Sequence, residues 1–225
     1  MKILAISTST DKASVCISEN EKLLCVLTAD VKKKHSEVLM PLIDQILDLT
    51  ETKIEDIDLY VCDTGPGSFT GIRIGVSTVN AFMISTGKMT AGISSLDIIA
   101  ENVSAYNDVT VCIIYARNDQ VYGAVYMGKE LQDSYFAGSI DEFLEKQISS
   151  EYDSIIFTGD GSKIFQDKII KKFNKKIRFS QEKDDVISAY SLASIAFRKG
   201  GSKEYIKPLY LKKSSAKVMR DGKNI

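Results

Sequence analysis

The stretch DTGPGSFTGIRIG, residues 63–75, follows the strand-like run DLYVC and leads into an apolar, helix-like segment. Its first nine residues contain three glycines, which permit positive φ angles and a close approach of other backbone. Three known motifs do not fit. A Walker P-loop requires a lysine and then Ser or Thr after the last glycine, and here Ile72 follows Gly71. A dinucleotide fingerprint fails because position 70 is threonine, and a nucleophile elbow fails because Pro66 lies two residues before Ser68.

These exclusions leave a strand-to-helix turn with two open interpretations. Ser68 or Thr70 can cap the helix that follows, so the stretch could serve only as a tight, capped turn. A helix N-terminus also attracts anions, so Gly65, Gly67, Ser68 and Thr70 are candidates for an anion or nucleotide contact.

The order of predicted elements around this turn occurs twice. The first half predicts strands 2–7, 14–18 and 23–28, helix 35–50, strand 58–63, the glycine turn, a helix to residue 86, strand 90–94 and a helix from residue 95. The second half predicts strands 109–115, 121–127 and 130–136, helix 139–148, strand 154–159, helix 162–173 and helix 188–200. The turns DTGPGS (63–68) and FTGDGS (157–162) match. We therefore predict a duplicated α/β fold of two βββαβα lobes, 1–105 and 106–213, with a basic tail at 214–225 that could return to the first lobe.

Composition narrows the class of protein. The 225 residues carry a net charge of −1, which gives no global basic field for nucleic acid. The N-terminal apolar run is too short for a signal peptide or a membrane span, so we expect a cytoplasmic protein without membrane contact. The four cysteines occur singly in apolar runs, which favours buried thiols in a reducing compartment over a redox or zinc site.

Helices 35–50 and 71–86 are apolar around a wide part of their circumference, roughly 200° for the first. A helix that covers one sheet needs about half of that arc, so the second contact is either internal or an intermolecular helix bundle. Pro41 raises the alternative that the first helix begins there. For a partner or dimer surface, the candidates are Leu39, Leu42, Ile43, Ile46, Ile72, Val76, Val79 and Met83.

Four segments together resemble one family. GPGSFTGIRIG (65–75), HSEVLMPLI (35–43), ILAISTST (3–10) and PLYLKK (208–213) are similar to the TsaB (YeaZ) family, paralogues of TsaD/Kae1 with a duplicated actin-like (ASKHA, ribonuclease H-like) fold. The resemblance implies a non-catalytic subunit in tRNA modification. TsaD transfers threonylcarbamoyl to the adenosine beside the anticodon. The subunit scaffolds and activates TsaD through helices 35–50 and 71–86 and provides a platform for the ATPase TsaE.

The same resemblance implies self-association through these helices, only indirect or weak contact with tRNA, and no required cofactor. Weak ATP or ADP binding at a shared interface stays open. Two alternatives also stay open, a free-standing actin-like ATPase or small-molecule kinase and, more remotely, a glycoprotease-like metallopeptidase.

Departures from the enzymatic relatives argue against catalysis. The H-x-x-x-H metal motif of TsaD-like proteins is broken here, because the position of its second histidine, four residues after His35, holds Leu39. No metal site is therefore expected. Relatives often read DTS and DAR where this chain reads STS (7–9) and YAR (115–117). Ser7 and Tyr115 cannot supply carboxylates to hold Mg²⁺ or activate water. We therefore expect no catalytic residues.

Overall fold

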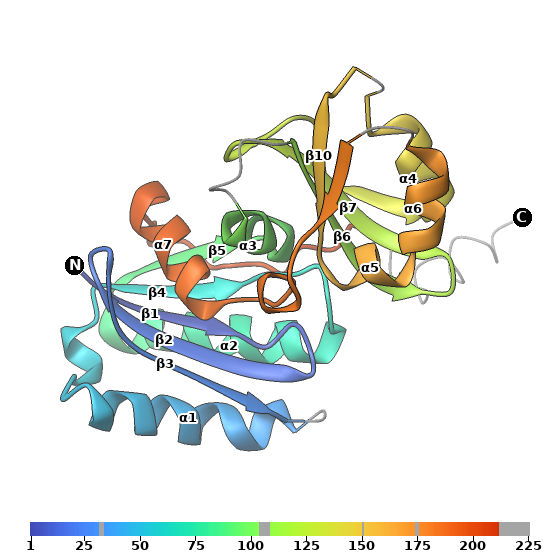
Figure 1. The fold of residues 1–225 in the computed structure, drawn as a ribbon. Coiled ribbons are helices and arrows are strands. Elements are labelled where there is room, and N and C mark those ends of the chain that lie inside the picture. The colour runs from blue at the N-terminus through green and yellow to red at the C-terminus, as the bar shows by residue number, and fades with distance from the viewer. Residues whose placement is uncertain (32–33, 104–108, 150, 174–175, 212–225) are drawn as a thin grey trace, which may run out of the picture.

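Two β-sheets with helices on their faces make up the fold (Figure 1). The computed structural model describes residues 1–31, 34–103, 109–149, 151–173 and 176–211. The predicted tail, 214–225, and the predicted lobe boundary at 105/106 lie outside these residues.

The first sheet has the order β3-β2-β1-β4-β5. Its strands are β1 (Lys2–Ser7), β2 (Lys12–Glu19), β3 (Lys22–Asp30), β4 (Leu59–Asp63) and β5 (Met89–Ile93). β1 pairs antiparallel with β2 and parallel with β4, and its residues Ile3 to Ile6 are fully buried. Such a central strand, covered on both faces, explains the continuous apolar run ILAI. Helices α1 (His35–Leu49) and α2 (Phe69–Thr86) cover one face, and α7 (Ala189–Lys199) covers the other.

The second sheet repeats this plan with the order β11-β10-β6-β7-β8, and β9 pairs with β7. Its strands are β6 (Val109–Arg117), β7 (Gln120–Met127), β8 (Glu130–Leu131), β9 (Phe136–Ser139), β10 (Ser154–Thr158) and β11 (Lys176–Phe179). In the order of elements, α4 (Ile140–Lys146) corresponds to α1. Two short helices, α5 (Asp160–Ile164) and α6 (Gln166–Lys172), correspond to α2. The single-turn helices η1 (Ile54–Asp56) and η2 (Glu182–Asp184) complete the elements.

The two halves exchange their last helices. α3 (Ser95–Asn102) packs Leu96, Ile99 and Ala100 against Cys112 and Tyr126 of the second sheet. Helix α7 comes from the second half but packs Leu192, Ala193 and Ala196 onto Ile3 and Ala5 of the first. The two helices also contact each other and lie between the sheets (Figure 1). The 188–200 helix, predicted within the 106–213 lobe, therefore belongs to the core of the first sheet.

Several predicted elements differ in detail. The predicted strand 130–136 is two short strands, β8 and β9, and the predicted helix 162–173 is interrupted at Phe165. β11 is absent from the prediction. Helix α1 begins at His35, so the alternative start at Pro41 is wrong; the proline sits exposed on the solvent side of the helix. Among the described residues, no helix is long and apolar enough to cross a membrane.

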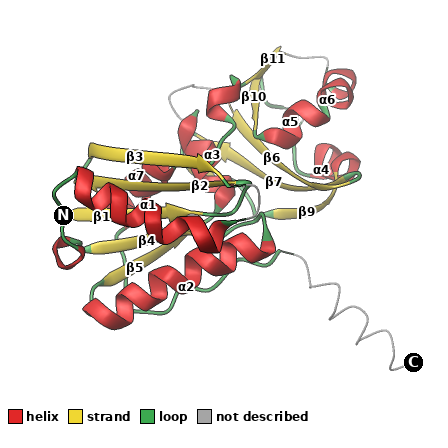
Figure 2. Cartoon of the chain, turned by 90° about the horizontal axis from the view of Figure 1, so that it is seen from below, coloured by secondary structure: helices red, strands yellow, loops and turns green. Residues whose placement is uncertain are grey.

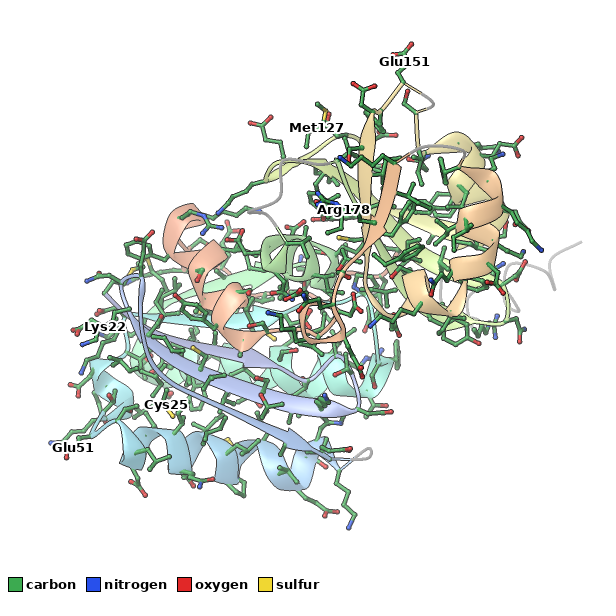
Figure 3. All side chains as sticks on the ribbon, in the orientation of Figure 1. Lys22, Cys25, Glu51, Met127, Glu151 and Arg178 are labelled. Atoms are coloured by element: carbon green, nitrogen blue, oxygen red, sulfur yellow. The ribbon has the colours of Figure 1, made fainter. Side chains whose placement is uncertain are left out.

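The cysteines pack as small apolar residues, as predicted. Cys16, Cys62 and Cys112 are buried thiols. Cys25 is half-buried and packs on the side of β3 that faces α1 (Figure 3).

Candidate functional site

The glycine turn between β4 and α2 is held against the β1–β2 connection. A Cβ at Gly67 would overlap the carbonyl oxygen of Ser9, and one at Gly71 would overlap that of Thr8. Gly65 has φ +96°, a left-handed conformation that favours glycine. The three glycines of the turn therefore have structural explanations, namely one backbone conformation and two close approaches of neighbouring backbone.

Three N–H groups of this turn, those of Gly65, Ser68 and Gly71, already have acceptors within the chain. Gly65 N–H donates to Asp63 Oδ1 at 2.9 Å, and Ser68 N–H donates to Ser9 O at 2.7 Å. Ser68 is the N-cap of α2, and its Oγ accepts a hydrogen bond from Gly71 N–H at 3.3 Å. This geometry matches the capped-turn interpretation. An anion at the turn stays a prediction, and it would have to compete with these internal acceptors.

Asp63 is the centre of a buried hydrogen-bond network at the end of β4. Its Oδ2 accepts from the hydroxyls of Ser7, at 2.9 Å, and Ser9, and its Oδ1 accepts from Ser95 Oγ at 2.6 Å and from Gly65 N–H. Burial raises the pKa of the Asp63 carboxyl above its ordinary value, while the hydrogen bonds act in the opposite direction. Ser7, at the end of β1, thus donates to a structural aspartate.

A cleft of about 1030 Å³ separates the two lobes. It is lined by the β1–β2 connection, the glycine turn, the end of β6 and residues 185–189 and 209–211. Of the four residues predicted to contact an anion, Gly67 and Ser68 line the cleft. Gly65 and Thr70 are not among the described residues that line it.

The carboxylates in the second-lobe wall of this cleft have internal partners. Asp160 Oδ1 accepts from the N–H groups of Tyr115, at 3.0 Å, and Gly161, at 2.8 Å, and burial raises its pKa. Asp185 accepts from Gly159 N–H at 2.9 Å and forms an ion pair with Lys163 at 2.7 Å. Both side chains hold the β10–α5 turn in place, which gives them a structural role.

Metal-ligating side chains are not gathered at this site. Among the described residues, no group of three or more His, Cys, Asp or Glu side chains is placed to hold a metal ion. His35 is buried, and its Nε2 lies 2.8 Å from the Thr10 carbonyl oxygen. The imidazole therefore helps to attach the start of α1 to the β1–β2 connection.

The structure corrects the choice of partner-facing residues on α1 and α2. Seven of the eight candidates are buried against the first sheet; they are Leu39, Ile43, Ile46, Ile72, Val76, Val79 and Met83. Only Leu42 is half-buried at the edge of this core. The apolar arc of each helix has an inner and an outer side. The residues predicted for the partner surface lie mainly on the inner side, which faces the molecule's own core.

The other side of the two helices is exposed and still partly apolar. Figure 2 shows α1 and α2 side by side on the first sheet. Leu49 on α1 is 61% exposed and Ile84 on α2 is 67% exposed. We call the apolar residues on this side the outer helix surface; they are Val38, Met40, Leu42, Leu49, Ile74, Ala81 and Ile84, all exposed or half-buried.

A cluster that the sequence did not predict lies at the cleft end of α2. Arg73 Cζ lies 3.7 Å from the centroid of the Phe69 ring, and Arg73 Nε donates to the Tyr210 hydroxyl at 3.0 Å. The rings of Phe69 and Tyr210 are 5.5 Å apart. The cluster joins two of the segments quoted for the family resemblance, GPGSFTGIRIG and PLYLKK, which the fold brings together.

Comparisons with known proteins agree on the family. A sequence model of the family described as TsaD, tRNA N6-adenosine threonylcarbamoyltransferase, matches residues 25–216. The tRNA threonylcarbamoyladenosine biosynthesis protein TsaB of Buchnera aphidicola subsp. Acyrthosiphon pisum is 36% identical over 152 residues, 66% of this chain and 67% of that protein. The TsaB of Buchnera aphidicola subsp. Schizaphis graminum is 28% identical over 200 residues, 84% of this chain and 93% of the relative.

Solved structures share the architecture. YeaZ from Pseudomonas aeruginosa superposes with a TM-score of 0.78 at 22% identity, over 93% of this chain and 99% of the other. A ROK hexokinase from Thermus thermophilus superposes with a TM-score of 0.54 at 8% identity, over 89% of this chain and all of the other, which shows a common actin-like fold. The chain therefore belongs to the TsaB (YeaZ) family of tRNA threonylcarbamoyladenosine biosynthesis proteins, relatives of the TsaD transferase with the duplicated actin-like fold.

Proposed function

We propose that this protein is a non-catalytic subunit of the cytoplasmic machinery that adds threonylcarbamoyl to the adenosine beside the anticodon of tRNA. In this proposal it scaffolds and activates TsaD. The observation that carries the proposal is the outer helix surface. The core of the first sheet is already covered by the inner sides of α1 and α2, and Leu42 and Ile74 pack at its edge. The exposed side chains of Met40, Leu49 and Ile84 have no place in this core, and they need another explanation.

The chemistry of the cleft supports the non-catalytic part of the proposal. Ser7 donates to a buried aspartate, and Tyr115 presents a hydroxyl that accepts from Asn118 N–H at 2.9 Å. Asp160 and Asp185 are engaged by backbone N–H groups and a lysine. Carboxylates that already hold the fold together are poorly suited to position Mg²⁺ or a nucleophilic water.

Further partners follow from the same surface. We propose that two copies of this chain associate through the outer helix surface when TsaD is absent, because a closed symmetric pair would bury the same apolar side chains. A complex with TsaD would then offer a platform for TsaE. ATP or ADP, if bound, would bind weakly and at a shared interface.

A second candidate function is a free-standing ATPase or small-molecule kinase, favoured by the size of the inter-lobe cleft. Turnover of Mg-ATP by this chain alone would support it. The hydroxyls at the ends of β1 and β6 oppose it, since neither can act as a carboxylate.

The test of the first proposal is binding of this protein to its cognate TsaD with a matched pair of variants. Ile84→Glu places a charge on the outer helix surface, and we expect it to weaken the complex at least tenfold. Ile170→Glu is the control, because Ile170 is 51% exposed on α6, which lies beside the second sheet and away from α1 (Figure 1). Equal affinity for both variants would refute the assigned surface.

A further inference from the structure

The chain after α7 crosses the first lobe as an extended segment, residues 200–211, which we call the strap. Ser202 and Thr90 exchange two backbone hydrogen bonds of 2.8 and 2.9 Å at the edge of β5. Further along, Ile206 is bonded to Asn80 of α2, and Leu209 N–H donates to Thr64 O at 2.9 Å. The strap is therefore attached at several points, and its outward side chains keep a fixed order on the surface.

The exposed side chains of the strap are mostly cationic or aromatic, with one acidic residue, Glu204, among them. Lys203, Tyr205 and Lys207 are exposed, with Tyr205 at 62%, whereas Ile206 between them is half-buried. Tyr210, 50% exposed, follows at the cleft end. An exposed tyrosine leaves a large apolar ring in water. When a partner covers the ring, the hydroxyl can still form hydrogen bonds, so tyrosines are common in contact surfaces.

The start of α2 extends this row. Arg73 stacks on Phe69 and donates to the Tyr210 hydroxyl, so two rings and a guanidinium share one exposed cluster. Two residues of α2 bind the strap: Asn80 binds Ile206, and Arg73 binds Tyr210. They are seven residues apart, or about 10 Å along the helix axis. The strap thus runs beside α2 from its middle to its N-terminus and ends at the cleft.

The cationic side chains of the strap and of Arg73 have no acidic partner among the described residues. Arg73, Lys203 and Lys207 form no ion pair with any residue in the described part of the chain. Three lysines elsewhere in the chain, Lys129, Lys146 and Lys168, each pair with a carboxylate at 3.0 Å or less and provide a comparison. Glu204 is the one acidic residue of residues 200–211.

We propose that the strap, together with Phe69 and Arg73, is a contact surface for unpaired nucleotides of RNA. The cations would bind phosphates, and the rings of Tyr205, Tyr210 and Phe69 would stack on exposed bases, as on other surfaces that hold single-stranded nucleic acid. The choice of RNA rests on the proposed function, whose substrate carries its target adenosine beside an unpaired anticodon. The strap borders the outer helix surface, so RNA could lie along it while TsaD is bound.

The test uses the full chain in complex with its cognate TsaD and an unmodified tRNA transcript at several salt concentrations. Reversing Lys203 and Lys207 together to glutamate should weaken tRNA binding more than tenfold. The slope of log affinity against log salt should fall by about 1.5, as expected for two lost phosphate contacts. Tyr205→Ala should weaken binding about tenfold, and Tyr205→Phe should restore it because the ring remains. Lys146→Glu, an exposed lysine paired with Glu142, is the control that should bind as the wild type.

Several outcomes would overturn the proposal. These are unchanged affinity in both strap variants, an equal loss in the Lys146→Glu control, or preference of the wild-type chain for anionic vesicles over tRNA. The mass of each complex, measured in the same samples, separates the two proposals. A strap variant that no longer pairs with TsaD would place the strap in the protein interface and refute the RNA surface. A wild-type chain that binds tRNA through these residues but does not pair with TsaD would refute the scaffold role alone.

Discussion

Asn80 of α2 and Ile206 of the strap exchange two hydrogen bonds. Asn80 Nδ2 donates to the Ile206 carbonyl oxygen at 2.9 Å, and Ile206 N–H donates to Asn80 Oδ1 at 2.9 Å. These residues are 126 positions apart, and the carboxamide acts as a strand-like partner for one residue of extended backbone. The pair attaches the C-terminal part of the chain to the helix that begins at the glycine turn.

Asn80→Ala should therefore destabilise the protein by about 1–2 kcal/mol, because two hydrogen bonds are lost at a half-buried position. Urea unfolding measures this loss, and amide hydrogen exchange should show faster exchange at Ile206. Ser85→Ala is the matched control on the same helix, since Ser85 is exposed and donates only to Phe82 O. Slow exchange at Ile206 in the Asn80→Ala protein would contradict this account of the strap.

Two glutamate substitutions on α2 should separate its core side from its outer side. Val76 is 5% exposed, so Val76→Glu buries a charge and should cost about 3–5 kcal/mol of unfolding free energy. Ile84→Glu should change stability by less than about 0.5 kcal/mol, because the side chain is already mostly in water. Thermal and urea unfolding test this contrast. The assignment of Val76 to a partner surface implies that Val76→Glu leaves the fold intact, and similar stabilities of the two variants would support that assignment.

Gly71 is expected to tolerate no side chain, although it lies inside a helix. Helix propensity alone predicts that Gly71→Ala stabilises by about 1 kcal/mol. The new Cβ would overlap the Thr8 carbonyl oxygen, so we expect a net loss of about 2 kcal/mol instead. Gly87→Ala is a useful comparison, because nothing lies near its Cβ and only its φ of +68° resists the change, at about 1 kcal/mol. A stabilised Gly71→Ala protein would show that the turn and the β1–β2 connection are not in close contact.

The buried carboxyl of Asp63 should leave a signature in the pH dependence of stability. Because its pKa is raised in the folded state above the ordinary value of 3.8, the native protein holds the proton more tightly than the unfolded chain. Its contribution to stability is then largest below the unfolded pKa and declines as pH rises through the folded pKa. The stability of the wild type relative to Asp63→Asn should accordingly fall as pH rises above the unfolded pKa of 3.8. Urea unfolding at a series of pH values tests this, and a difference that grows with pH would contradict it.

Much of the fold could be predicted from the sequence because its central strands are continuous apolar runs between clear turn residues. The repeated order of predicted elements and the two matching glycine turns were enough to predict the duplication. β11 was missed because four residues that alternate Lys-Ile-Arg-Phe are too short a pattern to stand out. The exchange of α3 and α7 between the sheets depends on tertiary packing that periodicity does not encode.

The candidate site was harder to predict. The apolar arcs of α1 and α2 identified two-sided helices, but which side met the sheet depends on how the helices are rotated against it. The residues that face the sheet were therefore taken for the partner surface. Asp63 was not recognised because its donors Ser7, Ser9 and Ser95 are 32 to 56 positions away in the sequence. The strap was not predicted as an element, because its contacts with α2 join residues that are 126 and 137 positions apart in the sequence.

The central claim is that the outer surface of α1 and α2 binds TsaD. The most direct test is the mass in solution, by light scattering, of this protein alone and mixed with its cognate TsaD. The account predicts a self-associated pair that is replaced by a 1:1 complex when TsaD is added, because both use the same surface. A protein that remains monomeric in both samples would contradict the account and return the cleft between the lobes to consideration as an ATPase site.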